Sequence, residues 1–304
     1  MEAATLPTVS IVTPSFNHAP FIEQTILSVL EQEYPKLEYL VIDGGSSDGT
    51  LDILKKYDGR LKYISEPDHG QADAINKGFM RSGGEILAWL NSDDTYASGA
   101  IRAVAEIFAA QPDIGVVYGD ADFIDAHGNF IAPCAHIENF NRHRLLYYSD
   151  YLVQPAVFFR RAIFESAGGL DVSLNWAMDY DLWLKFAART EFSYLRKTLA
   201  HYRWLGGSKT AGGGAARIEE VRRVALRYGA RGLPAFFHLE AVRMHLAQAT
   251  TEMREGHFGP AIYQGLASAR SLLSSPRAIR SLFSPQTWSI IATGRKLRRS
   301  ASGK

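Results

Sequence analysis

The sequence lacks the features that mark secreted, membrane-spanning or nucleic-acid-binding proteins. With a single cysteine, Cys134, it can form no intramolecular disulfide, and it suits a reducing compartment. No apolar run reaches the ~18 residues that a membrane-spanning helix needs, and the first residues show no secretory signal. The net charge of +1 gives no general attraction to a polyanion. These absences predict a soluble cytoplasmic protein that binds no nucleic acid.

The C-terminal part of the chain lacks acidic residues. Residues 256–304 contain no Asp or Glu but carry eight Lys and Arg residues, with large apolar residues such as Trp288 among them. A basic, apolar tail over 270–304 would lie on an anionic membrane surface, which would make the protein peripheral on the cytoplasmic face of the membrane. The alternative is a helical cap on the main domain that ends in a disordered basic segment.

Strand and helix patterns alternate through the first 119 residues. Apolar runs typical of buried strands cover 8–13, 37–43, 61–66, 85–90 and 115–119. Helical periodicity covers the intervening segments 20–32, 50–57, 71–80 and 98–110. This alternation predicts an α/β fold with a mostly parallel sheet flanked by helices, and ligands bind such sheets beyond the carboxyl ends of their strands.

Past residue 120 the pattern changes. The sequence predicts a hairpin that turns at 125–128, helices over 160–169 and 178–189, and a strand over 191–204. From residue 215 to roughly residue 275 the chain has the character of helices. We therefore expect an α/β domain over 1–214 and a helical extension over 215–304.

Polar loops follow three of the expected strands. "TPSFN" (13–17) can cap the next helix, and "DGGSSDGT" (43–50) places Asp43 where its carboxylate would accept hydrogen bonds from a base or a sugar. "NSDD" (91–94) sets two carboxylates side by side, and a divalent cation shared with a diphosphate would stabilise them, because Mg²⁺ and Mn²⁺ prefer oxygen ligands. The alternative for Asp93 or Asp94 is an N-cap of the helix that begins near residue 98.

In the order "VTPSFN … VIDGGSSDGT … WLNSDD", these loops resemble the family-2 glycosyltransferases over roughly residues 7–210. These are inverting enzymes that use nucleotide sugars and have a GT-A fold, a Rossmann-like α/β sheet flanked by helices. The resemblance implies a nucleotide-sugar half at about 1–119 and an acceptor half at about 120–214. It also implies that the donor is bound by Thr13, Pro14, Asn17, Asp43, Asp68, Asp73, Lys77, Asn91, Ser92 and Asp93.

The resemblance puts "NSDD" where the family carries its Asp-x-Asp motif. Asn91 stands in place of the first Asp, which leaves Asp93 as the metal ligand and Asp94 as a second one. The cofactor that this implies is Mg²⁺ or Mn²⁺. Asn91 would still hydrogen-bond the ribose or a phosphate through its neutral amide.

The segment "WAMDYDLWLKFA" (176–187) resembles the family's Glu-Asp segment at the head of a helix, with Met178 where Glu is common. Asp179 is therefore expected to be the general base that takes the proton of the attacking acceptor hydroxyl. Asp181 is the competing candidate, and it is otherwise expected to contact the acceptor together with Gln154. The alternative role for Asp181 is that of a first-turn acid that complements the helix dipole.

The segment "AHYRWLGGSKT" (200–210) resembles the family's mobile loop over the donor. This implies that His201, Arg203, Ser208 and Lys209 contact the diphosphate. Many relatives carry a His where this chain has Leu205. The alternative for His201 is a strand histidine satisfied by its neighbours.

Together these features predict a metal-dependent inverting glycosyltransferase that takes part in the assembly of a surface glycan. It would move a sugar from a UDP- or dTDP-sugar to a hydroxyl of a glycan or a lipid-linked acceptor. The alternative is a non-catalytic sugar-nucleotide or glycan-binding module of the same fold, because Asn91 and Met178 depart from the family's pattern. A nucleotidyltransferase is disfavoured, since "TPSFNHAP" has no Gly, Lys or Arg with which to bind phosphates after the first strand.

Overall fold

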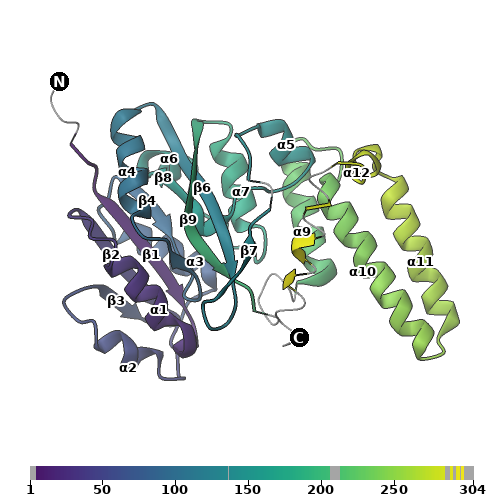
Figure 1. The fold of residues 1–304 in the computed structure, drawn as a ribbon, viewed down its shortest axis with the longest axis horizontal. Coiled ribbons are helices and arrows are strands. Elements are labelled where there is room, and N and C mark those ends of the chain that lie inside the picture. Colours follow the sequence, from purple (N-terminus) through teal and green to yellow (C-terminus); the bar gives the residue numbers. More distant parts are fainter. Residues whose placement is uncertain are drawn as a thin grey trace.

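The computed structural model describes residues 5–135, 137–205 and 213–284, together with residues 288–289, 292–294 and 296–297. Across this part of the chain one sheet holds nine strands (Figure 1). They are β1 (Val9–Ser15), β2 (Leu37–Asp43), β3 (Lys62–Ser65), β4 (Ile86–Trp89), β5 (Thr95–Tyr96), β6 (Ile114–Ile124), β7 (Phe130–Pro133), β8 (Val157–Arg160) and β9 (Glu191–Arg203). Their order across the sheet is β3-β2-β1-β4-β8-β6-β9-β5, and β7 pairs with β6.

Most of the described strands run in the same direction. β1 pairs in parallel with β2 and β4, β2 with β3, and β6 with β9. β8 lies antiparallel between β4 and β6, so these two strands point the same way, whereas β5 and β7 run against their neighbours. The predicted mostly parallel sheet is confirmed, and β5, β7 and β8 are its antiparallel exceptions.

The strand predicted at 115–119 is longer in the structure, because β6 continues to Ile124 before the chain turns. Asp125 holds this turn through its Oδ1, which accepts the backbone N–H groups of His127 and Asn129, both at 2.8 Å. Gly128 adopts a φ of 89°, a left-handed conformation that glycine accommodates without strain. The chain then returns as β7, which confirms the predicted hairpin.

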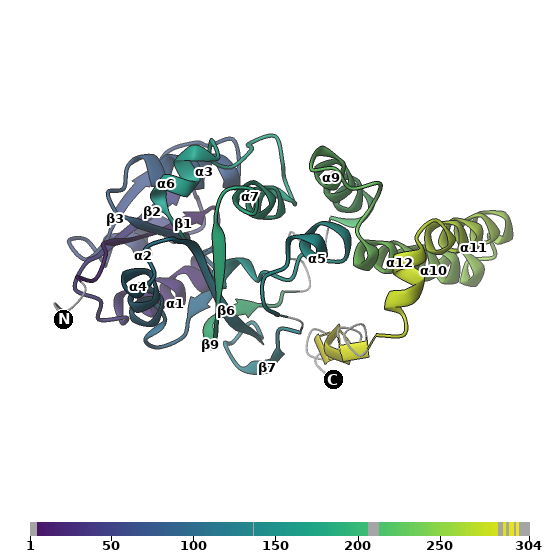
Figure 2. The ribbon, with the colours of Figure 1, turned by 90° about the horizontal axis from the view of Figure 1, so that it is seen from above.

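Helices cover both faces of the sheet. Figure 2 shows α1 (Ala19–Leu30) and α4 (Ala100–Ala110) on one side, and α3 (Gln71–Met80), α6 (Arg161–Ser166) and α7 (Met178–Phe186) on the other. Because successive side chains of a strand point to opposite faces, Ile11 packs with α1 and α4 while Val12 packs with α3 and α7. Burial on both faces accounts for the nearly continuous apolar runs of these strands.

The shorter elements of the α/β part are α2 (Thr50–Lys55), α5 (Arg142–Tyr147) and the 3₁₀-helix η1 (Gln154–Ala156). On the face covered by α7, the indole rings of Trp89 in β4 and Trp183 in α7 stack with their centroids 5.6 Å apart. This stacking joins α7 to the strand whose carboxyl end carries the "NSDD" loop.

The described part of the extension contains α9 (Gly214–Arg227), α10 (Ala235–Arg254), α11 (Phe258–Leu273) and α12 (Pro276–Ser281). α10 and α11 form a hairpin that projects away from the sheet (Figure 1). The Phe236 backbone N–H donates to the Tyr148 carbonyl at 2.8 Å, and the Arg277 guanidinium lies 4.7 Å from the centroid of the Tyr147 ring. Within the described residues, no helix combines the length and the apolar character that crossing a bilayer requires.

Candidate active site

A cavity of about 650 Å³ lies at the carboxyl ends of β1 and β4, where parallel sheets bind their ligands. Its walls come from the loops after these strands, from η1, from the starts of α3 and α7, and from the end of β9. The lining residues are Pro14, Ser15, Phe16, His18, Asp68, Gly70, Gln71, Ala74, Asn91, Ser92, Asp93, Asp94, Gln154, Asn175, Trp176, Met178, Asp179, Tyr202 and Leu205.

The structure brings part of the predicted site together in this cavity. The predicted residues that line it are Pro14, Asp68, Asn91, Ser92, Asp93, Asp94, Gln154 and Asp179. The predicted residues that lie elsewhere are Thr13, Asn17, Asp43, Asp73, Lys77, Asp181, His201 and Arg203. Ser208 and Lys209 lie outside the described residues.

Asn91 is the centre of an amide network at the end of β4. Its Oδ1 accepts from Gln71 Nε2 at 2.7 Å, and its Nδ2 donates to Asp94 Oδ2 at 3.2 Å and to Gln154 Oε1 at 3.1 Å. Gln154 Nε2 in turn donates to the Trp89 carbonyl at 2.8 Å. Asn91 therefore joins α3, η1 and the "NSDD" loop, and its amide donates where an Asp at this position would repel Asp94.

Asp94 lines the cavity, but its side chain is almost fully buried. Besides Asn91, the backbone N–H of Arg203 donates to its Oδ1 at 2.8 Å, so each carboxylate oxygen has a partner within the protein. Burial raises the pKa of Asp94 well above its usual range, and the neighbouring charge of Asp93 raises it further. These contacts explain how a second acid is accommodated at the end of a buried strand.

Asp93 is only half-buried and lines the cavity. Burial raises the pKa of its carboxyl, while the charges of His18 and Arg203 act in the opposite direction. Of the two adjacent acids, Asp93 thus has the carboxylate that is available to a ligand. An oxygen donor at the end of a cavity of this size fits a Mg²⁺ or Mn²⁺ ion that is shared with phosphate oxygens.

His18 lies in this cavity, although the sequence did not single it out. Its Nδ1 and the Ser92 Oγ are joined by a hydrogen bond of 2.6 Å, and its charge acts on the Asp93 carboxyl. The imidazole therefore bridges the loop after β1 and the "NSDD" loop. The only signal in the sequence was its position directly after "TPSFN", which does not distinguish it from any residue that begins a helix.

Arg203 holds the "NSDD" loop from the side away from the cavity. Its Nε donates to the Asp93 carbonyl at 2.6 Å, and its Nη1 donates to the carbonyls of Asp125 and Ala126 at 2.8 and 3.1 Å. Its Nη2 donates to Gln24 Oε1 at 2.7 Å. These contacts occupy the buried guanidinium, so in this structure Arg203 supports the loop.

His201 lines a second cavity, of about 350 Å³, whose wall also includes Arg203, Gln24 and Phe130. Burial lowers the pKa of its imidazole, and Asp122, whose Oδ2 lies 4.0 Å from Nδ1, opposes this effect. The structure therefore does not bring His201 together with Asp93 and Asp179 at the larger cavity.

The Asp43 carboxylate is enclosed by its own loop. Oδ2 accepts from the backbone N–H groups of Gly45 and Ser46 at 3.1 and 2.9 Å and from Ser65 Oγ at 2.7 Å. The hydroxyl of Ser46 donates to Oδ1 at 2.5 Å. With no exposed surface, Asp43 shapes the "DGGSSDGT" loop in this structure.

Two residues of the first loop also make contacts within the protein. The Thr13 hydroxyl, which is buried, shares a hydrogen bond of 3.1 Å with Tyr39 OH. Asn17 Oδ1 accepts the Ser47 backbone N–H at 2.9 Å, and the Asn17 backbone N–H donates to Ser46 Oγ at 2.8 Å. The first and second polar loops are therefore packed against each other.

The acids before and within α3 differ in their surroundings. Asp68 lines the cavity, and its Oδ1 accepts the Gly70 backbone N–H at 2.8 Å. Asp73 pairs with Lys77 Nζ at 3.0 Å and accepts the His69 backbone N–H at 3.0 Å, which together with the Lys77 charge lowers its pKa. Asp73 and Lys77 thus support the start of α3 beside the cavity.

Asp179 stands in the first turn of α7 and lines the same cavity as the "NSDD" loop. Its Oδ1 accepts the Tyr180 backbone N–H at 2.8 Å. Burial raises the pKa of Asp150 well above its usual range, and the Asp179 charge raises it further. The cavity is therefore bounded by one acid at the end of β4 and another at the start of α7.

Asp181 has a different place on the same helix. It is fully buried, and its carboxylate receives Lys185 Nζ at 2.9 Å, Arg227 Nη1 at 3.0 Å and Tyr228 OH at 2.9 Å. These contacts join α7 to α9. In this structure the Asp181 carboxylate has no exposed surface and does not line the cavity.

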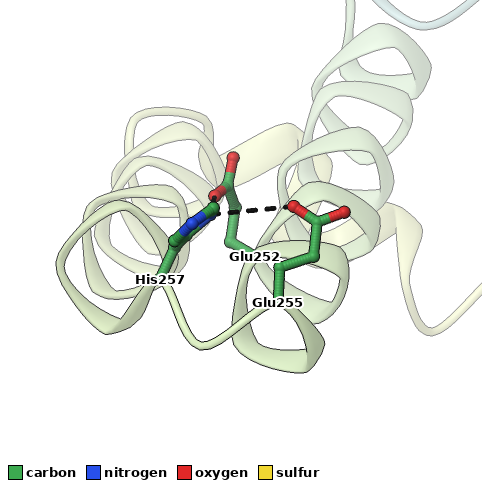
Figure 3. Close-up of side chains that lie close together, drawn as sticks. All are labelled: Glu252, Glu255 and His257. Atoms are coloured by element: carbon green, nitrogen blue, oxygen red, sulfur yellow. Dashed lines mark hydrogen bonds and ion pairs between the residues drawn. The ribbon is translucent and has the colours of Figure 1, made fainter.

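A further group of potential metal ligands lies at the turn between α10 and α11. Figure 3 shows that the side chains of Glu252, Glu255 and His257 lie close together. The Nδ1 of His257 is 3.1 Å from Glu252 Oε2 and 3.7 Å from Glu255 Oε2. The imidazole and the two carboxylates form ion pairs when the histidine is protonated. This cluster belongs to the tip of the hairpin and to none of the elements that line the larger cavity.

Comparisons of sequence place these observations among known proteins. A family model described as Glycosyl transferase family 2 matches residues 10–167. An uncharacterized glycosyltransferase of Rickettsia typhi is 29% identical over 191 residues, which are 59% of this chain and 58% of that protein. The chondroitin synthase of Escherichia coli is 29% identical over 217 residues, which are 69% of this chain and 31% of that protein. The chain therefore spans less than two thirds of the length of these relatives.

Solved structures share the fold. TarS 1-349 of S. aureus in complex with UDP-GlcNAc superposes with a TM-score of 0.61 at 18% identity, over 86% of this chain and 81% of that chain. The mannosyltransferase PcManGT of Pyrobaculum calidifontis in complex with GDP-Man and Mn²⁺ has a TM-score of 0.57 at 21% identity, over 97% of this chain and 86% of that chain. At these identities the similarity establishes the GT-A arrangement of the sheet and its helices.

Proposed function

Because this chain belongs to glycosyl transferase family 2, we propose that it transfers a sugar from a nucleotide-sugar donor to an acceptor hydroxyl with inversion at the anomeric carbon. The observation that carries the proposal is one cavity that brings together Asp93 at the end of β4 and Asp179 at the start of α7. The first would serve the donor diphosphate and the second the acceptor. The donor would be a UDP- or dTDP-sugar, and a solved structural neighbour binds UDP-GlcNAc.

Asp179 would act as the general base. As the acceptor oxygen forms its bond to the anomeric carbon, the bond from that carbon to the diphosphate oxygen breaks, and the acceptor proton passes to the Asp179 carboxylate. Its place in the first turn of a helix favours the ionised form through the helix dipole. Asp181 was the competing candidate for the base. It is buried beside the cations Lys185 and Arg227 and does not line the cavity.

A divalent cation, Mg²⁺ or Mn²⁺, would be held by Asp93. When bound, it would neutralise the charge that develops on the leaving diphosphate. Asp94 would act through its contacts with Asn91 and Arg203, because both of its oxygens already have partners. That a fold neighbour was solved with Mn²⁺ supports a metal of this class.

Donor recognition would come from cavity residues and from the loops behind them. Pro14, Asp68, Asn91 and Ser92 would contact the nucleotide sugar directly, since they line the cavity. The residues that would act by shaping these loops are Thr13, Asn17, Asp43, Asp73, Lys77 and Arg203. Gln154 would contact the acceptor while it holds the Asn91 amide.

The acceptor would be a surface glycan or a lipid-linked saccharide, in line with the chondroitin synthase among the relatives. A lipid-linked acceptor would be met at a membrane surface, which the basic tail over 270–304 was expected to bind. The structure adds to this expectation on α11, where Phe258, Ile262, Leu266 and Leu273 follow one another at helical spacing and are each 64–72% exposed. Such an apolar stripe beside basic residues is typical of helices that lie in a membrane interface.

The test of the proposed function is transfer by the purified chain and by Asp179→Asn. Wild-type protein with Mn²⁺ should consume one nucleotide sugar of a donor panel, and D179N should bind that donor with similar affinity while transfer falls by about 10²–10⁴-fold. Asp113→Asn, which changes an exposed acid outside the cavity, is the matched control. Full transfer by D179N would remove Asp179 from the role of base.

A non-catalytic binding module is the second candidate, and Met178 and Asn91 are the observations that favour it. Both lie in the cavity at positions where the family commonly carries acids. One experiment distinguishes the two candidates, namely the hydrolysis of nucleotide sugars by the purified protein with a metal and without an acceptor. An enzyme slowly hydrolyses its donor under these conditions. Binding without any turnover across the donor panel would favour the module.

A further inference from the structure

Glu220 of α9 reaches out of the helical extension and contacts the loop that leads into α7. Its side chain is buried, with 3% exposure, and its carboxylate accepts three consecutive backbone N–H groups. Oε2 accepts from Asn175 at 3.1 Å, and Oε1 accepts from Trp176 at 2.6 Å and from Ala177 at 2.7 Å. A charged acceptor with three backbone donors is among the stronger contacts that a side chain makes.

These donors lead up to the N-terminus of α7, because Asn175 and Trp176 directly precede its N-cap residue. Ala177 is the N-cap residue and has no side chain that accepts from the first turn. The carboxylate of Glu220, 43 positions further along the chain, accepts the N–H of this N-cap residue and those of the two residues before it. The segment that leads into α7 is thus held by another helix, whereas within the first turn the Tyr180 N–H donates to Asp179 Oδ1.

α9 holds α7 at a second point one turn further on. Arg227 Nη1 and Tyr228 OH both donate to Asp181 Oδ1, at 3.0 and 2.9 Å. The two helices lie side by side in both ribbon views (Figures 1 and 2). Asp179 lies between the two contacts, two residues after the last N–H that Glu220 receives and two before Asp181.

We propose that Glu220 is a positioning residue for Asp179, and that the helical extension thereby forms part of the catalytic unit. It fixes the first turn of α7, so that the Asp179 carboxylate meets the acceptor hydroxyl at a defined place in the cavity. The inference rests on the proposed role of Asp179 as general base. The sequence analysis predicted a boundary at residue 214 between the α/β domain and the extension. Under this proposal the catalytic unit includes α9, which lies beyond that boundary.

The charge of Glu220 has a second effect on Asp179. A carboxylate at the N-terminus of α7 offsets part of the helix dipole, which would otherwise lower the basicity of Asp179. Among the described residues, other charged groups near this helix start include Asp150, whose pKa the Asp179 charge raises, Arg217, which acts on Asp150, and Arg223, whose Nη2 lies 4.0 Å from Glu220 Oε2. From across the cavity, Asp68 and Asp93 add negative charge. Removing the Glu220 charge should therefore lower the pKa of Asp179.

The experiment compares Glu220→Gln and Glu220→Ala with Glu219→Gln in the full chain. Glu219 is the neighbouring acid, exposed and paired with Arg222, so its variant changes the same charge without touching α7. We expect E220Q to lower kcat by about 10-fold and E220A by about 100-fold, with the donor KM within about twofold of wild type, because small displacements of a catalytic group have effects of this size. The acid limb of the kcat profile should move to lower pH in E220Q, while E219Q should match wild type in both readouts.

Hydrogen exchange provides a readout that does not depend on catalysis. The amides of Trp176 and Ala177 should exchange faster in E220Q and E220A than in E219Q, because they lose their acceptor. Donor binding by calorimetry and a cooperative thermal transition check that each variant is folded.

Two results would overturn the proposal. The first is an E220Q protein with the kcat, the pH profile and the amide exchange of E219Q. The second is a parallel loss of donor binding and cooperative unfolding in both Glu220 variants, which would make Glu220 a residue for global stability only. Failure of the proposed function has a different signature, because it would appear as absent transfer by wild type or full transfer by D179N. In that case faster exchange of the Trp176 and Ala177 amides in the Glu220 variants would still show that Glu220 holds the segment before α7.

Discussion

Arg203 donates its backbone N–H to Oδ1 of Asp94 over 2.8 Å, although the two residues are 109 positions apart. The guanidinium of the same arginine donates to the carbonyl of Asp93 and to the carbonyls of Asp125 and Ala126 in the hairpin turn. The loop that carries the proposed metal ligand is therefore held in place by the end of β9. Its geometry depends on the last strand of the sheet as much as on its own residues.

Replacing Arg203 tests this support. Arg203→Lys keeps the backbone contact with Asp94 and a positive charge, but a single ammonium cannot reach Asp93, Asp125, Ala126 and Gln24 together. We expect the free energy of unfolding to fall by about 2–4 kcal/mol, because buried carbonyls lose their donors. Urea unfolding measures this change. Arg196→Lys, at an exposed site of the same strand, is the control, and an equal effect at both positions would contradict the prediction.

The hydrogen bond from Asn91 to the buried Asp94 should stabilise the fold. In Asn91→Asp the amide that donates to Asp94 becomes a second carboxylate, and Gln154 Oε1 loses its donor as well. The free energy of unfolding should fall by about 1–3 kcal/mol without metal, and Mn²⁺ should recover part of the loss by binding the added acid. A thermal-shift series with and without Mn²⁺ measures both effects.

Asn129→Asp is the matched control for this change. Asn129 also donates to an aspartate, Asp125, at 3.0 Å, but that pair is exposed. Solvent screens the repulsion between two exposed carboxylates, so the variant should lose well under 1 kcal/mol. A larger loss at Asn129 than at Asn91 would show that burial does not decide the effect.

The stability of the protein should depend on pH through Asp94. Because burial raises its pKa above the ordinary value of 3.8, the folded state keeps this proton to higher pH than the unfolded state does. Ionisation therefore costs stability, and the cost appears as the pH rises from 3.8 through the raised pKa. Asp94→Asn has no proton to lose at this site.

The measurement is the free energy of unfolding of wild type and D94N between pH 4 and about pH 7. The difference should shift in favour of D94N as the pH rises, with a slope of at most about 1.4 kcal/mol per pH unit. Asp93, whose pKa is also raised, is present in both proteins, but its charge raises the pKa of Asp94, so the difference reports the titration of the two neighbouring acids together. A difference that stays constant with pH would mean that Asp94 is ionised throughout this range.

The exposed stripe of α11 should bind anionic membranes. Ile262→Glu places a charge in the middle of the stripe, and we expect it to reduce co-sedimentation with phosphatidylserine-containing vesicles by about 10-fold or more. Val172→Glu changes an exposed apolar residue of the α/β part and should bind as wild type does. Vesicles of phosphatidylcholine alone should bind weakly, because α11 and α12 present Arg270 and Arg280 rather than acids.

Two outcomes would contradict this membrane prediction. One is equal binding of I262E and wild type to the anionic vesicles. The other is a wild-type protein that ignores both kinds of vesicle but forms dimers that I262E abolishes, since the stripe would then be covered by a second copy of the chain.

Much of the fold could be predicted from the sequence because its signals are local. Apolar runs near Val12, Val41 and Ala88 predicted strands, and the intervening periodicity predicted helices. The direction of β8 could not be predicted in the same way, since pairing between β4 and β6 depends on segments that are distant in the chain. The length of β6 was underestimated for the same reason, because its last residues are held by β7 and β9.

For the site, the sequence by itself determined which polar loops end the strands and which acids they offer. It singled out Asp93 and Asp179 because their types and order resemble a family's motifs. Only the tertiary structure decided how these acids are used, because a carboxylate's chemistry depends on its partners. Asp94 accepts hydrogen bonds from Asn91 and from β9, Asp181 is paired with Lys185 and Arg227, Asp43 is enclosed by its own loop, and Asp93 and Asp179 line the cavity. Residues such as His18 and Glu220 carry no motif, and their contacts appear only when segments far apart in the chain pack together.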